Sequence, residues 1–168
     1  MQKSGAEEGQ VTETDRLKLQ FLKDEYLHLQ KVVEDFDARA ITIKGWSVTF
    51  SLAAIVAAFT YHVPAALLLA SFTSVLFWVT EAFWKMFQET YFERAEEIEA
   101  FFAGKNEHIV PLQIGMTWQK RWERDRHRRL WRTAYIMFTW AHVAIPHVAI
   151  ALTGVVLYIS VKSGALNL

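Results

Sequence analysis

The feature that most constrains this chain is an uncharged apolar stretch, residues 45–80, which contains no Asp, Glu, Lys or Arg. As a single helix these 36 residues would extend about 54 Å, well beyond the ~30 Å hydrocarbon core of a bilayer. A turn at His62, Val63 and Pro64 would divide the stretch into two spans. Pro64 suits the first turn of the returning helix, where its missing N–H leaves no gap. The sequence therefore predicts a transmembrane hairpin, residues 45–84, with spans 45–61 and 64–84.

Charge is strongly segregated along the chain, although the formal net charge is zero. Residues 1–44 carry 7 basic and 9 acidic groups, residues 81–107 carry 3 and 7, and residues 117–132 carry 7 and 2. Residues 133–161 carry none, which predicts a third transmembrane helix over that range. The chain has no cysteine, which excludes disulfides and thiolate chemistry. The polar N-terminus predicts no cleavable signal peptide, so the first span would direct insertion.

The segment before the hairpin is predicted to be one long helix. Residues 1–13 are expected to form a flexible tail, with Thr12 or Thr14 as helix cap and Asp15 in the first turn. An apolar residue then recurs every three or four positions through residues 14–44, typical of a heptad pattern: Leu19, Leu22, Tyr26, Leu29, Val33, Phe36 and Ala40. Two arrangements remain open for this stripe. It could pack on other helices of the same chain, or form a coiled coil between subunits.

The segments after the hairpin alternate between acidic and basic character. Residues 85–104 form an acidic amphipathic helix with Gly104 as its C-terminal cap, and residues 105–116 form a connector. Residues 117–132 are expected to form a basic helix that runs directly into the third span, followed by an external tail, residues 162–168. The predicted fold class is all-α: a multi-pass membrane protein with three transmembrane helices extended into a cytosolic helical stalk, residues 14–44 and 86–103.

Orientation follows from the distribution of Lys and Arg. Basic residues flank the first and third spans on one side, and the turn at residues 62–64 has none. The positive-inside rule then places the N-terminus in the cytosol and the C-terminus outside. Trp46, Trp84 and Trp131 would all lie at the cytosolic interface, where aromatic side chains are enriched. We expect localisation in the cell inner membrane.

Small residues line one face of each helix of the hairpin. Because lipid tails provide no hydrophobic drive between helices, close backbone approach at small residues favours association. The residues concerned are Ser47, Ser51, Ala54 and Ala58 in the first span, and Ala66, Ala70 and Ser74 in the second. These two faces are expected to meet each other or a neighbouring subunit.

Ionisable residues within the spans are the first candidate functional residues, because they are costly in a bilayer. His147 lies near the middle of residues 133–161 and Pro146 leaves the carbonyl of His142 without its helical donor. In an oligomer, His147 could line a pore or gate, with His142, Pro146 and Glu81 on the same ion or proton path. The alternative is a neutral imidazole bonded to Ser or Thr across a helix contact. For Glu81 the alternative is an interfacial ion pair with Lys85 at i+4.

The cations of residues 117–132 are the second set of candidates. They would anchor the chain to anionic lipids or contact another anionic ligand: Lys120, Arg121, Arg124, Arg126, Arg128, Arg129 and Arg132. A nucleotide or nucleic acid stacked on Trp118 and Trp122 is the less favoured alternative. The sequence contains no phosphate-binding loop, metal-binding motif or nucleophile elbow. We therefore predict no enzyme activity, no metal site and no cofactor.

The arrangement of helices resembles that of small bacterial SLATT-type membrane effectors of defence systems. The shared features are the helix entering at residues 41–50, the spans to Trp84 and the helix that follows to Phe102. The resemblance implies an oligomer that perturbs the membrane or forms a channel. On this basis we expect a channel-like effector controlled through its cytosolic helices. The alternative is a non-conducting anchor or scaffold that recruits a cytosolic protein partner.

Overall fold

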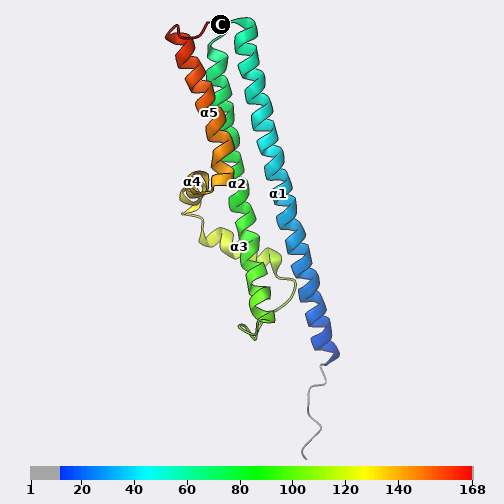
Figure 1. Ribbon diagram of the computed structural model, residues 1–168. Helices are drawn as coiled ribbons and strands as arrows, with labels where there is room; N and C mark the ends of the chain where they lie inside the picture. Colours follow the sequence, from blue (N-terminus) through cyan, green and yellow to red (C-terminus); the bar gives the residue numbers. More distant parts are fainter. Residues whose placement is uncertain (1–11, 168) are drawn as a thin grey trace, which may run out of the picture.

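The described residues, 12–167 of this computed structural model, fold into five helices and no strand (Figure 1). They are α1 (Glu13–Tyr61), α2 (Ala65–Phe102), α3 (Ile114–Arg124), α4 (Arg129–Thr139) and α5 (Ala141–Lys162). Helices α1, α2 and α5 are each long and apolar enough to cross a membrane. The predicted all-α class with three candidate spans is therefore confirmed. The proposed tail lies mostly in residues 1–11, outside the described part of the chain.

α1 is a single helix of 49 residues that passes through Gly45 without interruption. It begins at a capping box in which Thr12 accepts from the backbone N–H of Asp15 while the Asp15 side chain accepts from Thr12. It ends at His62, whose φ of 56° is left-handed. Val63 N–H then donates to Ala58 O, and α2 begins after Pro64. The hairpin turn therefore lies at the predicted residues.

The two long helices lie side by side, and α5 packs on them at the hairpin end (Figure 1). The small faces of α1 and α2 are buried against each other and against α5, at Ser47, Ser51, Ala58, Ala70 and Ser74. Serine hydroxyls bond backbone carbonyls across the helices. Ser51 donates to Ala70 O at 3.1 Å.

Gly154 is a point where α5 lies very close to α2. A Cβ added there would lie 2.3 Å from Ser71 Oγ and 2.7 Å from Leu67 O. Gly154→Ala should therefore push α5 away from α2 and lower the free energy of unfolding in detergent by about 1–3 kcal/mol. Gly45→Ala is the matched control, because an added Cβ there meets nothing within 4 Å. Equal stability of the two variants would contradict the packing described here.

The heptad stripe of α1 packs within the chain. Leu22 and Leu29 are fully buried against Ile98 of α2 and Ile109 of the connector. This is the first of the two arrangements considered from the sequence. Some of the stripe stays accessible at the tip, where Leu19 is exposed.

The C-terminal region differs from the predicted basic helix, residues 117–132, running into a span at 133–161. The structure divides this region into α3, α4 and α5, with breaks at residues 125–128 and at Trp140. The cause is tertiary, since arginines of this region pair with carboxylates of α2 and hold α3 and α4 across it. The third candidate span is only Ala141–Lys162, whose 22 residues extend about 33 Å.

Candidate functional site

Four polar side chains from three helices meet between the candidate spans. Lys44 and Ser47 come from one face of α1, Glu81 from α2 and His147 from α5. We call these four residues the ionic cluster. Ser47 and Glu81 lie on the small-residue faces that bring α1 and α2 together. His147 shares its face of α5 with Gly154, whose close contact with α2 positions the imidazole.

The carboxylate of Glu81 is the centre of the ionic cluster. Its Oε2 lies 3.0 Å from His147 Nε2, and its Oε1 lies 2.6 Å from Lys44 Nζ. The contact with Lys44 is an ion pair without hydrogen-bond geometry, so the buried Oε1 receives no hydrogen bond. Ser47 Oγ lies 2.9 Å from His147 Nδ1. Glu81, Ser47 and His147 are fully buried, and the Lys44 side chain is 23 % exposed.

The partners of His147 give the direction of one hydrogen bond in the ionic cluster. Glu81 as a carboxylate can only accept, so Nε2–H of His147 donates to it. The other ring nitrogen, Nδ1, shares a hydrogen bond with the Ser47 hydroxyl. Lys44 and Glu81 form the ion pair of the cluster. The contact with Ser47 is the serine contact across helices that was considered as the alternative from the sequence, and the carboxylate of Glu81 is an additional partner.

The partner of Glu81 differs from the one proposed from the i+4 spacing. Lys85 does not pair with Glu81. Its Nζ instead pairs with Asp37 of α1 and donates to Gln88 Oε1 at 2.9 Å. The reason is geometric, since α1 lies beside α2 with Lys44 at the level of Glu81 and Asp37 at the level of Lys85. A buried charge is costly unless an opposite charge lies next to it, so each pairs with the residue at its own level.

Helix length gives the position of the ionic cluster along the bundle. Lys44 lies about 25 Å, Glu81 about 24 Å and His147 about 22 Å from the hairpin ends of their helices. In a hydrocarbon core of ~30 Å that starts at the hairpin turn, the cluster would lie about 6 Å inside the opposite boundary. His147 lies near the middle of residues 133–161, but within α5 it is nearer the stalk end, because that helix begins at Ala141 rather than residue 133.

The other two predicted members of an ion path lie apart from the cluster. His142 is exposed at the start of α5, with its ring 5.4 Å from that of Trp140. Pro146 lies inside α5 without ending it. Nearby, Ser74 donates to His147 O at 2.9 Å and Ser71 donates to Ala151 O at 2.9 Å. The structure thus joins His147 and Glu81, and leaves His142 outside.

A second buried ionic group, in the stalk, was not anticipated. Glu25 of α1 accepts from Arg94 Nε at 2.9 Å and Nη2 at 3.0 Å, and both residues are buried. The same carboxylate accepts from the backbone N–H groups of Leu112, at 2.7 Å, and Gln113, at 3.1 Å, just before α3. Leu112 has a φ of 63°, a conformation unfavourable for leucine. We call Glu25, Arg94, Leu112 and Gln113 the stalk latch.

The pKa of Glu25 reflects both burial and bonding. Burial by itself raises the pKa of the carboxyl, but the hydrogen bonds from Arg94, Leu112 and Gln113 outweigh it and hold the pKa below its ordinary value. Two features of the sequence could have indicated the Glu25–Arg94 pair. Glu25 precedes Tyr26 of the apolar stripe, and Arg94 is one of few cations in an acidic helix.

The seven cations of residues 117–132 fall into two sets. Arg121 and Arg124 pair with Glu93, Arg132 pairs with Glu89 and Asp125, and Arg129 lies 3.4 Å from the ring centre of Trp122. The guanidinium of Arg124 holds the pKa of Glu93 below its ordinary value. The others, Lys120, Arg126 and Arg128, are exposed.

The rings of Trp118 and Trp122, which were considered as a stacking surface for a nucleotide, stack on each other at 5.3 Å. Trp122 also stacks on Phe87 of α2, so its ring is already used in packing.

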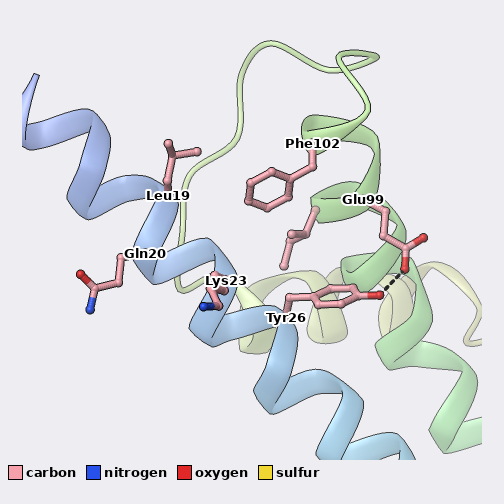
Figure 2. Close-up of a pocket in the computed structure, with 7 residues that line it drawn as sticks. Leu19, Gln20, Lys23, Tyr26, Glu99 and Phe102 are labelled. Atoms are coloured by element: carbon pink, nitrogen blue, oxygen red, sulfur yellow. Dashed lines mark hydrogen bonds between the residues drawn. The ribbon is translucent and has the colours of Figure 1, made fainter. Parts of the chain in front are cut away.

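A groove opens between α1 and α2 near the tip of the stalk (Figure 2). Its volume is about 670 Å³, and its lining is mainly apolar, with Tyr26 and Phe102 directed into it. The Tyr26 hydroxyl donates to Glu99 Oε1 at 2.7 Å, which joins the two walls. The full lining is Leu19, Gln20, Lys23, Tyr26, Ile98, Glu99 and Phe102.

Within the part of the chain that the structure describes, no three His, Asp or Glu side chains are grouped so that they could hold a metal ion. Comparison of the chain with protein-family models, curated proteins and solved structures finds no match.

Proposed function

We propose that this chain is a multi-pass bacterial inner-membrane protein that oligomerises and acts as a channel-like or membrane-perturbing effector controlled through its stalk. The stalk would lie in the cytosol together with the N-terminus, and the C-terminus outside. The observation that carries the proposal is the ionic cluster. A carboxylate, an ammonium group and an imidazole buried between three apolar helices are costly in a bilayer, and such groups are functional candidates by default.

The helices provide a mechanical route from the stalk to the ionic cluster. α1 and α2 each run unbroken from the stalk into the apolar hairpin, so a movement of the stalk also moves Lys44 and Glu81. In the described state Ser47, Glu81 and His147 fill the space between α1, α2 and α5. A signal received by the stalk would move α1, α2 and α5 apart. The contacts among Lys44, Ser47, Glu81 and His147 would then break. Exposed apolar side chains on the spans, among them Phe50, Val56 and Phe72, would contact lipid or other subunits.

Ion flux from liposomes containing the full chain tests this function. His147→Ala removes contacts to both Glu81 and Ser47, and a coupling of about 1–3 kcal/mol would shift the open-to-closed ratio roughly 5- to 150-fold. We expect the leak to rise by a factor in this range. His142→Ala is the matched control, because that ring is exposed and lies outside the cluster, and it should leave the leak unchanged. Bilayers that stay tight with every variant and at every pH would overturn the channel-like function.

The mass of the purified protein in detergent is measured first, since a stable monomer would exclude a pore between subunits.

The second candidate function is a non-conducting scaffold, and the stalk groove favours it. An apolar groove lined by Leu19, Ile98 and Phe102 is suited to an apolar helix of a protein partner. The scaffold function predicts tight bilayers in the flux measurement, so the same experiment separates the two.

A further inference from the structure

Helix α4 crosses the bundle rather than following it. In Figure 1 it is seen nearly end-on, while α2 and α5 lie along the picture. It is fixed to α2 at two points. Trp78 Nε1 donates to Met137 O at 3.2 Å, and Thr133 Oγ1 lies 3.5 Å from Met86 Sδ.

The level of α4 follows from these contacts. Trp78 lies about 20 Å and Met86 about 32 Å along α2 from its hairpin end. A hydrocarbon core of ~30 Å measured from the hairpin turn would end between these two levels. α4 therefore lies across the bundle where the apolar region ends at the stalk side.

The two faces of α4 differ sharply. Thr133 and Ile136 are buried against α2. On the other side, Leu130 is 75 % exposed, Trp131 78 %, Tyr135 64 % and Phe138 72 %. Positions 131, 135 and 138 are spaced by four and three residues and so share one face. Large apolar and aromatic side chains concentrated on one exposed face of a short helix are typical of helices that lie in a membrane interface.

The turn before α4 adds positive charge beside this apolar face. Arg126 and Arg128 are exposed, and within residues 12–167 neither forms an ion pair with a carboxylate, unlike Arg121, Arg124 and Arg132 nearby. A cation near a helix N-terminus is repelled by the helix dipole. Arg128, at the start of α4, therefore gains no stabilisation from the dipole of that helix. An anionic partner beside the apolar face would satisfy both features.

We propose that α4 is an in-plane anchor whose exposed face enters the stalk-side leaflet, with Arg126 and Arg128 binding the phosphate headgroups of anionic lipids. This inference depends on the membrane insertion proposed above, and on no channel activity. A lipid surface is favoured over a protein partner because the exposed face continues the apolar surface of the spans at the level where they end. Indole and phenol side chains prefer this interfacial depth.

Spin labels at single cysteines test the anchor in the full chain, which has no native cysteine. Leu130→Cys and Phe138→Cys report the α4 face, Glu123→Cys is an exposed control on α3, and Val156→Cys is an exposed position on α5. The vesicles contain equal parts of phosphatidylcholine and phosphatidylglycerol. We expect labels at 130, 138 and 156 to be accessible to oxygen and protected from an aqueous nickel complex, and the label at 123 to show the reverse.

The outcomes separate this inference from the proposed function. A lipid-immersed label at 156 with water-accessible labels at 130 and 138 would overturn the anchor alone. A water-accessible label at 156 would overturn both. Dipolar broadening between labels at 130 or 138 of two copies would place a second copy on this face and would also overturn the lipid assignment.

A second measurement tests the arginines. Binding of phosphatidylglycerol to the detergent-solubilised chain is followed by native mass spectrometry. Each cation near an anionic headgroup contributes a factor of about fivefold, so Arg126→Gln with Arg128→Gln should weaken binding about 25-fold. Lys31→Gln, an exposed charge removal in the stalk, is the control and should leave binding unchanged. Equal binding by the double variant and the control would overturn the role assigned to these arginines.

Discussion

Glu81→Gln is expected to lower the free energy of unfolding by about 3 kcal/mol, because removing one partner leaves the other charge of a buried ion pair uncompensated. Glu81 is fully buried, and Lys44 loses its 2.6 Å counter-charge. His147 Nε2 also loses its charged acceptor. The value is at the lower end for buried pairs, since the partly exposed Lys44 side chain can turn towards water. Denaturation in detergent micelles, followed by circular dichroism, measures the change.

A double-mutant cycle distinguishes the ion pair from loss of packing. Lys44→Met removes the opposite charge while keeping a long apolar side chain. If the two charges stabilise each other, Lys44→Met combined with Glu81→Gln should recover a large part of the stability lost in either single variant. Glu34→Gln, an exposed carboxylate of α1, is the control and should show no measurable change. Strictly additive losses would contradict a coupled pair.

Glu25→Ala is expected to lower the free energy of unfolding by about 3 kcal/mol, because it removes the buried carboxylate paired with Arg94 and leaves only the partly exposed Glu97 as counter-charge. It also removes the acceptor for the N–H groups of Leu112 and Gln113. The connector should then loosen around Leu112, whose unfavourable φ is no longer held by these bonds, while buried Ile109 and the bond from Arg94 Nη2 to Val110 O still attach its earlier part. Hydrogen exchange at these two amides and tryptic cleavage after Lys105 should both increase. Glu96→Gln, an exposed carboxylate of α2, should change neither.

The stalk latch also predicts a dependence on pH. The pKa of Glu25 in the folded chain is lower than its ordinary value of 4.5, so the folded state binds fewer protons than the unfolded state. The stabilisation is therefore complete above pH about 4.5 and is lost as the pH falls below this value through the folded pKa. Other carboxyls, Asp37 and Glu93 among them, have lowered pKa values too. The comparison is thus with Glu25→Gln, which should lose less stability on acidification than the unchanged chain. An identical acid dependence would contradict the role of Glu25.

The basic segment shows where local sequence reasoning was insufficient. Residues 125–140 contain no Gly or Pro, so no helix breaker indicated that residues 117–161 would divide into three helices. The division depends on Arg132 reaching Glu89 and Asp125, and on Trp122 stacking on Phe87. Glu89 precedes Arg132, and Phe87 precedes Trp122, by more than 30 residues in the sequence. The bounds of α4, and which arginines form ion pairs, could therefore be known only from the tertiary structure.

The sequence by itself determined the elements that depend on hydropathy and local stereochemistry. Segregated charge specified the three apolar helices, Pro64 and its neighbours the hairpin turn, and small residues the faces on which α1 and α2 meet. The tertiary structure decided the pairing of charges: Glu81 with Lys44 and His147 rather than Lys85, and Glu25 with Arg94. The physical reason is that helix periodicity shows which residues share a face, whereas the partner of a buried charge depends on how far one helix is shifted along its neighbour.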